Sequence, residues 1–139
     1  MSGRSRTALV LTASDGVTAG TRDDASGDAL ERRLVGLGFT VARAVVPDDQ
    51  PTIEAALRAG AAAGHSVIVT TGGTGLTPRD VTPQATRAVV DYEVPGLAEA
   101  MRATGRAITP LADLSRGVVG VVDRSLVINV PGSPKAALE

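Results

Sequence analysis

The sequence predicts an α/β fold in which a mostly parallel sheet carries helices on its faces and includes at least one late antiparallel strand. Two observations predict it. In the first half of the chain, apolar β-rich runs alternate with amphipathic helical segments through short connections. Near the end, two apolar runs follow each other with only two residues between them. Alternation favours parallel pairing with crossover helices, whereas a two-residue connection is typical of a hairpin.

Three strands are predicted in the first half, at 7–13, 39–46 and 66–71. Between them, residues 26–37 and 52–63 place apolar side chains at helical spacing, and glycine follows each of these segments. Such β-α-β-α-β order predicts that the three strands are mutually parallel. Their carboxyl ends then lie at one edge of the sheet.

Helices are also predicted after the third strand. Residues 72–81 form a Gly-rich loop, and Thr82 is expected to cap a helix that runs to Val90 with Pro83 at its first position. A short helix is expected over 97–102, and Ser133-Pro134 predicts one more helix start.

The late hairpin is predicted from the runs at 118–122 and 125–130. Asp123 and Arg124 alone connect them, which leaves room only for a tight turn. At least one of these two strands must therefore run against the others.

Composition limits the class of protein. The chain has 139 residues with no internal repeat or linker, which predicts a single domain over 1–139. Phe39 and Tyr92 are its only aromatic residues, so the core must be aliphatic, and from its spacing alone Tyr92 is expected to pack. The net charge of −1 offers no general attraction to nucleic acid or acidic lipid, so we expect neither as a partner.

Several kinds of site are disfavoured by missing residues. There is no cysteine, which excludes disulfides, thiolate ligands and a thiol nucleophile. His65 is the only histidine and is predicted at the end of the sheet opposite the Gly-rich loop, where surface or packing roles are favoured. The apolar run from Ala8 to Leu11 is too short for a signal peptide, so a cytoplasmic protein is expected.

The Gly-rich loop is the strongest local signal. Thr71, Gly72, Gly73, Thr74 and Gly75 follow a predicted strand directly. Adjacent glycines let the backbone approach a ligand and direct N–H groups at an anion. The same pattern fits a tight strand-to-helix turn equally well.

Three aspartates follow predicted strands or the Gly-rich loop: Asp15, Asp48 and Asp80. Ligands of open α/β sheets bind beyond the carboxyl ends of the strands, where these residues should meet. One isolated aspartate is more often a helix cap or a turn residue. Three that converge beside an anion-binding loop favour Mg²⁺ bound together with phosphate, since Mg²⁺ accepts one or two carboxylates and phosphate oxygens.

In combination, these segments resemble the MogA/MoaB family of molybdenum-cofactor biosynthesis proteins, which includes the G domain of gephyrin. The central motif is Thr71-Gly72-Gly73-Thr74-Gly75-Leu76-Thr77-Pro78-Arg79-Asp80-Val81-Thr82-Pro83. The other matching segments are Ser14-Asp15 with Asp24 and Gly27, Val46-Pro47-Asp48-Asp49, Glu93-Val94-Pro95-Gly96-Leu97, Met101-Arg102, Leu114-Ser115-Arg116 and Asn129-Val130-Pro131-Gly132-Ser133-Pro134-Lys135.

The resemblance implies a three-layer α/β/α sandwich with the molybdopterin-binding fold, assembled as a homotrimer. It implies a molybdopterin adenylyltransferase that transfers AMP from Mg-ATP to the terminal phosphate of molybdopterin and releases pyrophosphate. The implied catalytic residues are Asp48 and Asp80, which would hold Mg²⁺ or orient the triphosphate. The implied substrate contacts are Ser14, Asp15, Thr71, Gly72, Gly73, Thr74, Gly75, Glu93, Ser115, Pro131, Gly132 and Ser133.

The resemblance also implies a partner and some alternatives. An MoeA-like molybdenum insertase is the implied partner protein. The family usually continues some twenty residues beyond the last motif, so we expect a C-terminal end truncated relative to the family. A non-catalytic molybdopterin-binding member and a trimeric interaction module are the alternative functions. A dinucleotide oxidoreductase is disfavoured because the chain lacks G-x-G-x-x-G.

Overall fold

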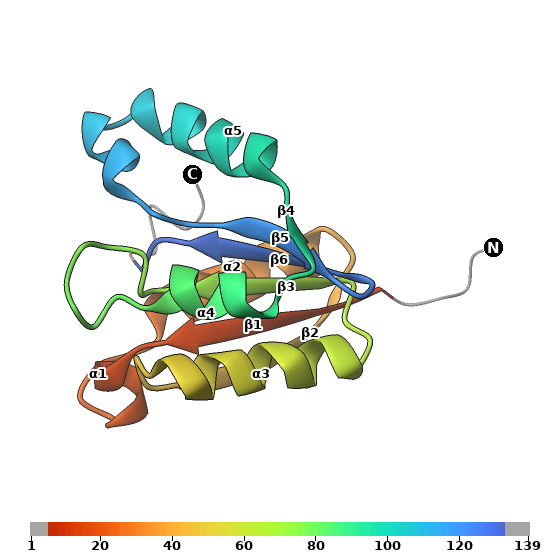
Figure 1. Ribbon diagram of the computed structural model, residues 1–139. Coiled ribbons are helices and arrows are strands. Elements are labelled where there is room, and N and C mark those ends of the chain that lie inside the picture. The colour runs from red at the N-terminus through yellow and green to blue at the C-terminus, as the bar shows by residue number, and fades with distance from the viewer. Residues whose placement is uncertain (1–5, 133–139) are drawn as a thin grey trace.

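The computed structural model describes residues 6–132, and one mixed sheet of six strands lies at its centre (Figure 1). The strand order is β2-β1-β3-β6-β5-β4. The strands are β1 (Thr7–Ala13), β2 (Thr40–Val46), β3 (Val67–Thr71), β4 (Tyr92–Glu93), β5 (Val119–Val122) and β6 (Ser125–Val130). β1, β2, β3 and β6 are parallel, and β5 runs antiparallel to both of its neighbours. The mostly parallel sheet with a late antiparallel strand is confirmed.

Helices cover both faces of this sheet and make the three predicted layers (Figure 1). The helices are α1 (Asp15–Thr18), α2 (Ala25–Gly36), α3 (Gln50–Ala62), α4 (Thr82–Val89), α5 (Pro95–Arg106) and the 3₁₀ helix η1 (Pro110–Leu114). Alternate residues of β1 point to opposite faces. Leu9 and Leu11 pack with α3 and α4 on one face, whereas Ala8 and Val10 pack with α2 on the other.

The core is aliphatic, as the composition requires. Leu11, Ile53, Leu57 and Ile68 are fully buried. The expected packing of Tyr92 is wrong, because 61% of this residue is exposed. β4 has only two residues at the edge of the sheet, and both are exposed, so they offer no interior position for a ring.

The hairpin is confirmed with its tight turn. Val122 pairs with Ser125, and Asp123 adopts a left-handed φ of 53°. Asp is one of the few residues that accept this conformation readily, which explains why two residues suffice for the connection.

Most helices start or end within a few residues of their predicted bounds, but the predicted cap of α4 is wrong. Val81, not Thr82, precedes the helix, and no side chain caps it. Thr82 is the first helical residue, and its N–H donates to the carbonyl of Gly73. Its hydroxyl is buried against Gly73 without a hydrogen-bond partner among the described residues. Thr82 therefore contacts the Gly-rich loop instead of capping α4.

Three elements were not predicted: α1, β4 and η1. Each is five residues or shorter, so none shows a measurable periodicity. α5 is longer than the expected 97–102 because it starts at Pro95 and continues to Arg106. The helix predicted at Ser133-Pro134 lies outside the described residues. No helix within 6–132 has the length and apolar character that crossing a membrane requires.

Candidate functional site

Two neighbouring pockets open at the carboxyl edge of the parallel strands. We call the first the acidic pocket, because Asp24, Asp48 and Asp80 line it. We call the second the apolar pocket, because Met101, Leu111, Leu114 and Val130 line it. Most of its lining residues belong to α5, η1 and β6. Their volumes are about 610 and 460 Å³. The predicted position of a site beyond these strand ends agrees with this arrangement.

Residues 72–81, called the Gly loop below, separate the two pockets. Gly72 and Gly73 have φ values of 94° and 73°, which side chains rarely adopt. A Cβ atom on Gly72 would lie 2.4 Å from the carbonyl oxygen of Ala13, and one on Gly73 would lie 2.2 Å from the hydroxyl of Thr82. Glycine is therefore required at both positions by conformation and by space.

The Gly loop presents a run of unpaired backbone amides. The N–H groups of Gly73, Thr74, Gly75 and Leu76 donate to no protein acceptor within the described residues. Successive free amides form a concave site of positive potential that suits phosphate or another anion. Of the two readings of this motif, anion binding is the one that these free amides favour.

The three predicted aspartates lie together around the acidic pocket. The N–H of Asp15 donates to Oδ2 of Asp48 at 3.0 Å, and the N–H of Asp48 donates to Oδ1 of Asp15 at 2.9 Å. Arg79 donates to Oδ2 of Asp15 from Nη2 at 2.7 Å and from Nε at 3.0 Å. Oδ2 of Asp80 accepts the N–H and the hydroxyl of Thr77 at 2.9 and 2.7 Å.

This environment shifts two carboxyl groups in opposite directions. Burial raises the pKa of Asp48. The hydrogen bond from the Asp15 backbone lowers this pKa, whereas the negative charges of Asp15 and Asp80 raise it further. The pKa of Asp15 is lowered by the hydrogen bond from the Asp48 backbone and by Arg79. Negative charge is thus concentrated where the anion-binding amides lie, and a cation would relieve the repulsion.

The carboxylates fit Mg²⁺ bound together with phosphate rather than Mg²⁺ held by protein alone. Among residues 6–132, no three acidic or histidine side chains are grouped to hold a metal ion. Oδ1 of Asp48 and Oδ1 of Asp80 accept no hydrogen bond from the described protein, so each is available to a ligand. Mg²⁺ commonly takes one or two carboxylates and completes its shell with phosphate and water.

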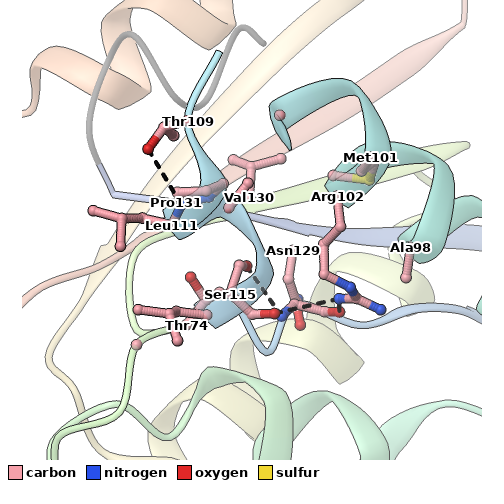
Figure 2. A pocket seen from close by; sticks show the side chains of 15 residues that line it. Thr74, Ala98, Met101, Arg102, Thr109, Leu111, Ser115, Asn129, Val130 and Pro131 are labelled. Atoms are coloured by element: carbon pink, nitrogen blue, oxygen red, sulfur yellow. Dashed lines mark hydrogen bonds between the residues drawn. The ribbon is translucent and has the colours of Figure 1, made fainter. Parts of the chain in front are cut away.

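The apolar pocket differs in character (Figure 2). Met101, Leu111 and Val130 contribute apolar surface, and among residues 6–132 Arg102 is the only charged residue in the lining. The pocket shares Thr74, Gly75 and Pro131 with the acidic pocket. A ligand with a planar apolar body and an anionic group would match this lining, and its anionic end could reach the Gly loop.

The predicted contacts other than Asp15, Glu93 and Ser133 line these pockets, and Asp15 is hydrogen-bonded to Asp48 of the acidic pocket. Ser14 lines the acidic pocket and caps α1 by accepting the N–H of Val17. The hydroxyl of Thr71 donates to the carbonyl of Pro131 and so joins the ends of β3 and β6. Ser115 lies in the apolar pocket (Figure 2).

Two predicted contacts lie elsewhere. Glu93 lines neither pocket and pairs with Arg87 at 3.6 Å on the outer strand β4. Ser133 lies outside the described residues. His65 precedes β3, at the end opposite the Gly loop as predicted, and its ring contacts the hydroxyl of Thr7.

Sequence reasoning missed the roles of two residues that belong to matching motifs. Asp24 lines the acidic pocket, caps α2 and binds Arg43. Arg116 contacts the Gly loop 41 residues earlier in the chain. The motif matches indicated that both positions matter for the family. The contacts of the two side chains are seen in the tertiary structure.

Comparison with known proteins agrees with this geometry. The model of the probable molybdopterin binding domain family matches residues 9–139. The chain is 42% identical over 130 residues to a molybdenum cofactor biosynthesis bifunctional protein of Synechococcus elongatus, covering 93% of this chain and 41% of that one. It is 45% identical over 111 residues to a molybdopterin adenylyltransferase of Haemophilus influenzae, covering 79% of this chain and 56% of that one.

A solved structure shows the same fold. The molybdopterin biosynthesis enzyme MoaB from Thermus thermophilus superposes with a TM-score of 0.89 at 50% identity, covering 95% of this chain and 84% of that one. The chain spans only about half the length of the two curated relatives described above. With its sheet order, its Gly loop and a family match over most of its length, the chain belongs to the family of probable molybdopterin binding domains.

Proposed function

We propose that this protein is a molybdopterin adenylyltransferase of molybdenum cofactor biosynthesis. One observation carries the proposal: Gly73, Thr74 and Gly75, whose amides are unpaired, line the same acidic pocket as Asp48 and Asp80, and an apolar pocket shares Thr74 and Gly75 with it. A reaction that joins two phosphorylated ring compounds needs such adjoining sites. The name of the Haemophilus influenzae relative describes that reaction.

The proposed step is nucleotidyl transfer. An oxygen of the terminal phosphate of molybdopterin forms a bond to the α-phosphorus of ATP, while the bond from that phosphorus to the oxygen bridging to the β-phosphorus breaks. Pyrophosphate leaves with the electron pair of the broken bond, and the product is adenylylated molybdopterin. Positioning and charge neutralisation provide most of the catalysis of such transfers.

The residues have distinct proposed roles. The amides of Gly73, Thr74 and Gly75 bind a phosphate group, and Asp48 and Asp80 hold Mg²⁺ with the triphosphate. Mg²⁺ supplies the positive charge that a triphosphate needs beside carboxylates. Further proposed substrate contacts are Ser14, Asp15, Thr71, Gly72, Ser115, Pro131, Gly132 and Ser133. Glu93 is proposed from the family resemblance alone, because it lines neither pocket.

The wider setting belongs to the proposal as well. We infer a homotrimer, an MoeA-like molybdenum insertase as partner and a cytoplasmic location, all from the family resemblance. We also infer that 1–139 is one domain. Within the described residues, the two core clusters lie on opposite faces of the same sheet and share strand β1, which supports this inference.

The test is Asp80→Asn in an assay of AMP transfer from Mg-ATP to molybdopterin. Oδ2 of Asp80 caps the turn at Thr77, and the amide oxygen of Asn can do the same. Asn lacks the charge that a hard cation needs, so we expect transfer to fall by more than about a hundredfold, roughly 2.7 kcal/mol in the barrier. The melting temperature should not change.

Near-normal transfer by Asp80→Asn would contradict the catalytic role of this residue. Absence of transfer by the unmodified protein, with molybdopterin binding retained, would favour the non-catalytic member. Trimer formation with neither binding nor transfer would favour the interaction module. Asp91→Asn is a suitable control, because Asp91 is an exposed carboxylate that accepts a backbone hydrogen bond from Asp123 far from the pockets.

A further inference from the structure

Arg116 contacts the Gly loop at three carbonyl groups. Its backbone N–H donates to the oxygen of Thr74 at 3.0 Å, its Nε to that of Gly75 at 2.8 Å and its Nη2 to that of Asp80 at 2.6 Å. Thr74 and Gly75 precede the exposed tip of the loop, and Asp80 follows it. One residue therefore ties together both sides of the loop.

These contacts determine where the amides of the loop point. In a planar trans peptide the C=O and the N–H point in opposite directions. Because the carbonyls of Thr74 and Gly75 point at Arg116, the N–H groups of Gly75 and Leu76 must point away from it. Both belong to the run of unpaired amides. Arg116 also keeps the negative ends of these peptide dipoles away from an incoming phosphate.

Arg116 is itself held firmly. Nη1 of Arg102 donates to the carbonyls of Ser115 and Gly117, at 3.4 and 3.0 Å, one on each side of Arg116 (Figure 2). The N–H of Gly117 donates to the hydroxyl of Ser115 at 3.3 Å. A Cβ atom on Gly117 would lie 3.1 Å from the carbonyl oxygen of Asn129, so the segment lies close against β6. The backbone on both sides of Arg116 is therefore held by Arg102 of α5 and lies against β6.

We propose that Arg116 is a positioning residue, which maintains the anion-binding conformation of the Gly loop without touching substrate. The kinetic part of this proposal rests on the proposed function, whereas the conformational part rests on the contacts alone. The competing explanation is a general brace of the fold. A positioning role predicts that loss of Arg116 changes amide exchange only in the Gly loop. A general stabilising role predicts that it changes exchange throughout the protein.

The test compares Arg116→Lys with Arg58→Lys. Lysine keeps the charge but cannot donate to two carbonyls in the fork geometry of a guanidinium. Arg58 is a matched control, because it is exposed and also donates to a backbone carbonyl, that of Ala88, away from both pockets. Amide hydrogen exchange of each protein is measured with and without Mg-ATP, together with kcat, KM and the melting temperature.

We expect Arg116→Lys to speed exchange of the hydrogen-bonded amides of Thr77 and Asp80 by about tenfold, with strands β1 and β3 unchanged. Mg-ATP should slow exchange of the unpaired amides from Gly73 to Leu76 in the unmodified protein and in Arg58→Lys, and slow it much less in Arg116→Lys. For AMP transfer, kcat should fall by about tenfold or more and KM for ATP should change less, because the amides are placed for the transition state.

Exchange and kinetics of Arg116→Lys that match those of Arg58→Lys would overturn the proposal. Faster exchange throughout the molecule, or failure of Arg116→Lys to fold, would also overturn it, because Arg116 would then be a general brace. If the unmodified protein shows protection of the loop by Mg-ATP but no AMP transfer, the proposed function fails. The exchange comparison would still decide the role of Arg116.

Discussion

Asp15 and Asp48 show how neighbouring residues of the same type acquire different properties. Each accepts the backbone N–H of the other, and yet the pKa of Asp15 is lowered while that of Asp48 is raised. The difference arises because Asp15 also has Arg79 beside it, whereas Asp48 is more buried and faces two negative charges. Asp48 is thus the carboxylate that gains most from a cation.

The raised pKa of Asp48 predicts a stability effect. A carboxyl group with a higher pKa in the folded protein favours folding when protonated, and this contribution is lost as the pH rises through the folded pKa. At neutral pH, ionised Asp48 therefore opposes folding. We expect Asp48→Asn to raise the melting temperature at pH 7 by about 2 °C, and the gain to vanish as the pH falls to the ordinary value of 3.8.

Thermal melts of both proteins between pH 3.5 and about 7 would measure this. Asp49→Asn is the control of opposite sign, because hydrogen bonds from Thr52 lower the pKa of Asp49. Ionised Asp49 favours folding above its unfolded pKa, so its replacement should bring no gain at pH 7. A lower melting temperature for Asp48→Asn at pH 7 would contradict the electrostatic account.

At the scale of elements, the Gly loop is constrained from three directions. β1 approaches Gly72, the start of α4 approaches Gly73, and Arg116 contacts the carbonyls further along. The loop therefore depends on residues that are distant in sequence. The conformation of the loop is therefore determined by its contacts with β1, α4 and the segment before β5, and not by the glycines alone.

Gly72→Ala tests this dependence. A methyl group there would meet the carbonyl oxygen of Ala13 at 2.4 Å, and alanine also disfavours the φ of 94°. We expect the free energy of unfolding to fall by about 2–4 kcal/mol, of which about 1–2 kcal/mol reflects the positive φ. Gly38→Ala is the control, since Gly38 has a φ of 99° with open space around it. Urea unfolding that gives equal losses for both variants would show that space at Gly72 is unimportant.

At the scale of the whole molecule, the α5–η1 layer exposes apolar side chains within residues 6–132. Leu97, Ile108, Leu111 and Leu114 are each about half exposed or more, and Ala98 is the only buried residue of α5. A domain of this size buries a limited share of its surface, so assembly would add burial that one chain lacks.

The proposed homotrimer predicts a mass three times that of one chain. Light scattering at micromolar concentration would measure it directly. Because apolar burial strengthens in salts such as sulfate, we expect the assembly to persist when such salts are added. A stable monomer under these conditions would contradict the trimer, without bearing on the contacts within the acidic pocket.

The α/β class, the strands of the parallel half and the hairpin could all be predicted from the sequence. These follow from periodicities of two and 3.6 residues and from turn residues, all of which act over short distances. The sequence also indicated that Asp15, Asp48 and Asp80 would meet, because parallel strands direct their carboxyl ends to one edge. The family motifs further predicted that the Gly loop and Pro131 contact substrate.

The contacts of the remaining side chains could not be predicted in this way and are seen in the folded protein. Thr82 faces Gly73 instead of capping α4, Tyr92 is exposed on a two-residue edge strand, and Arg116 reaches a loop 41 residues earlier. Glu93 lies away from the pockets although its motif matches. The physical reason is common to all four: each role depends on which distant backbone lies beside the residue, and no local periodicity encodes that neighbour.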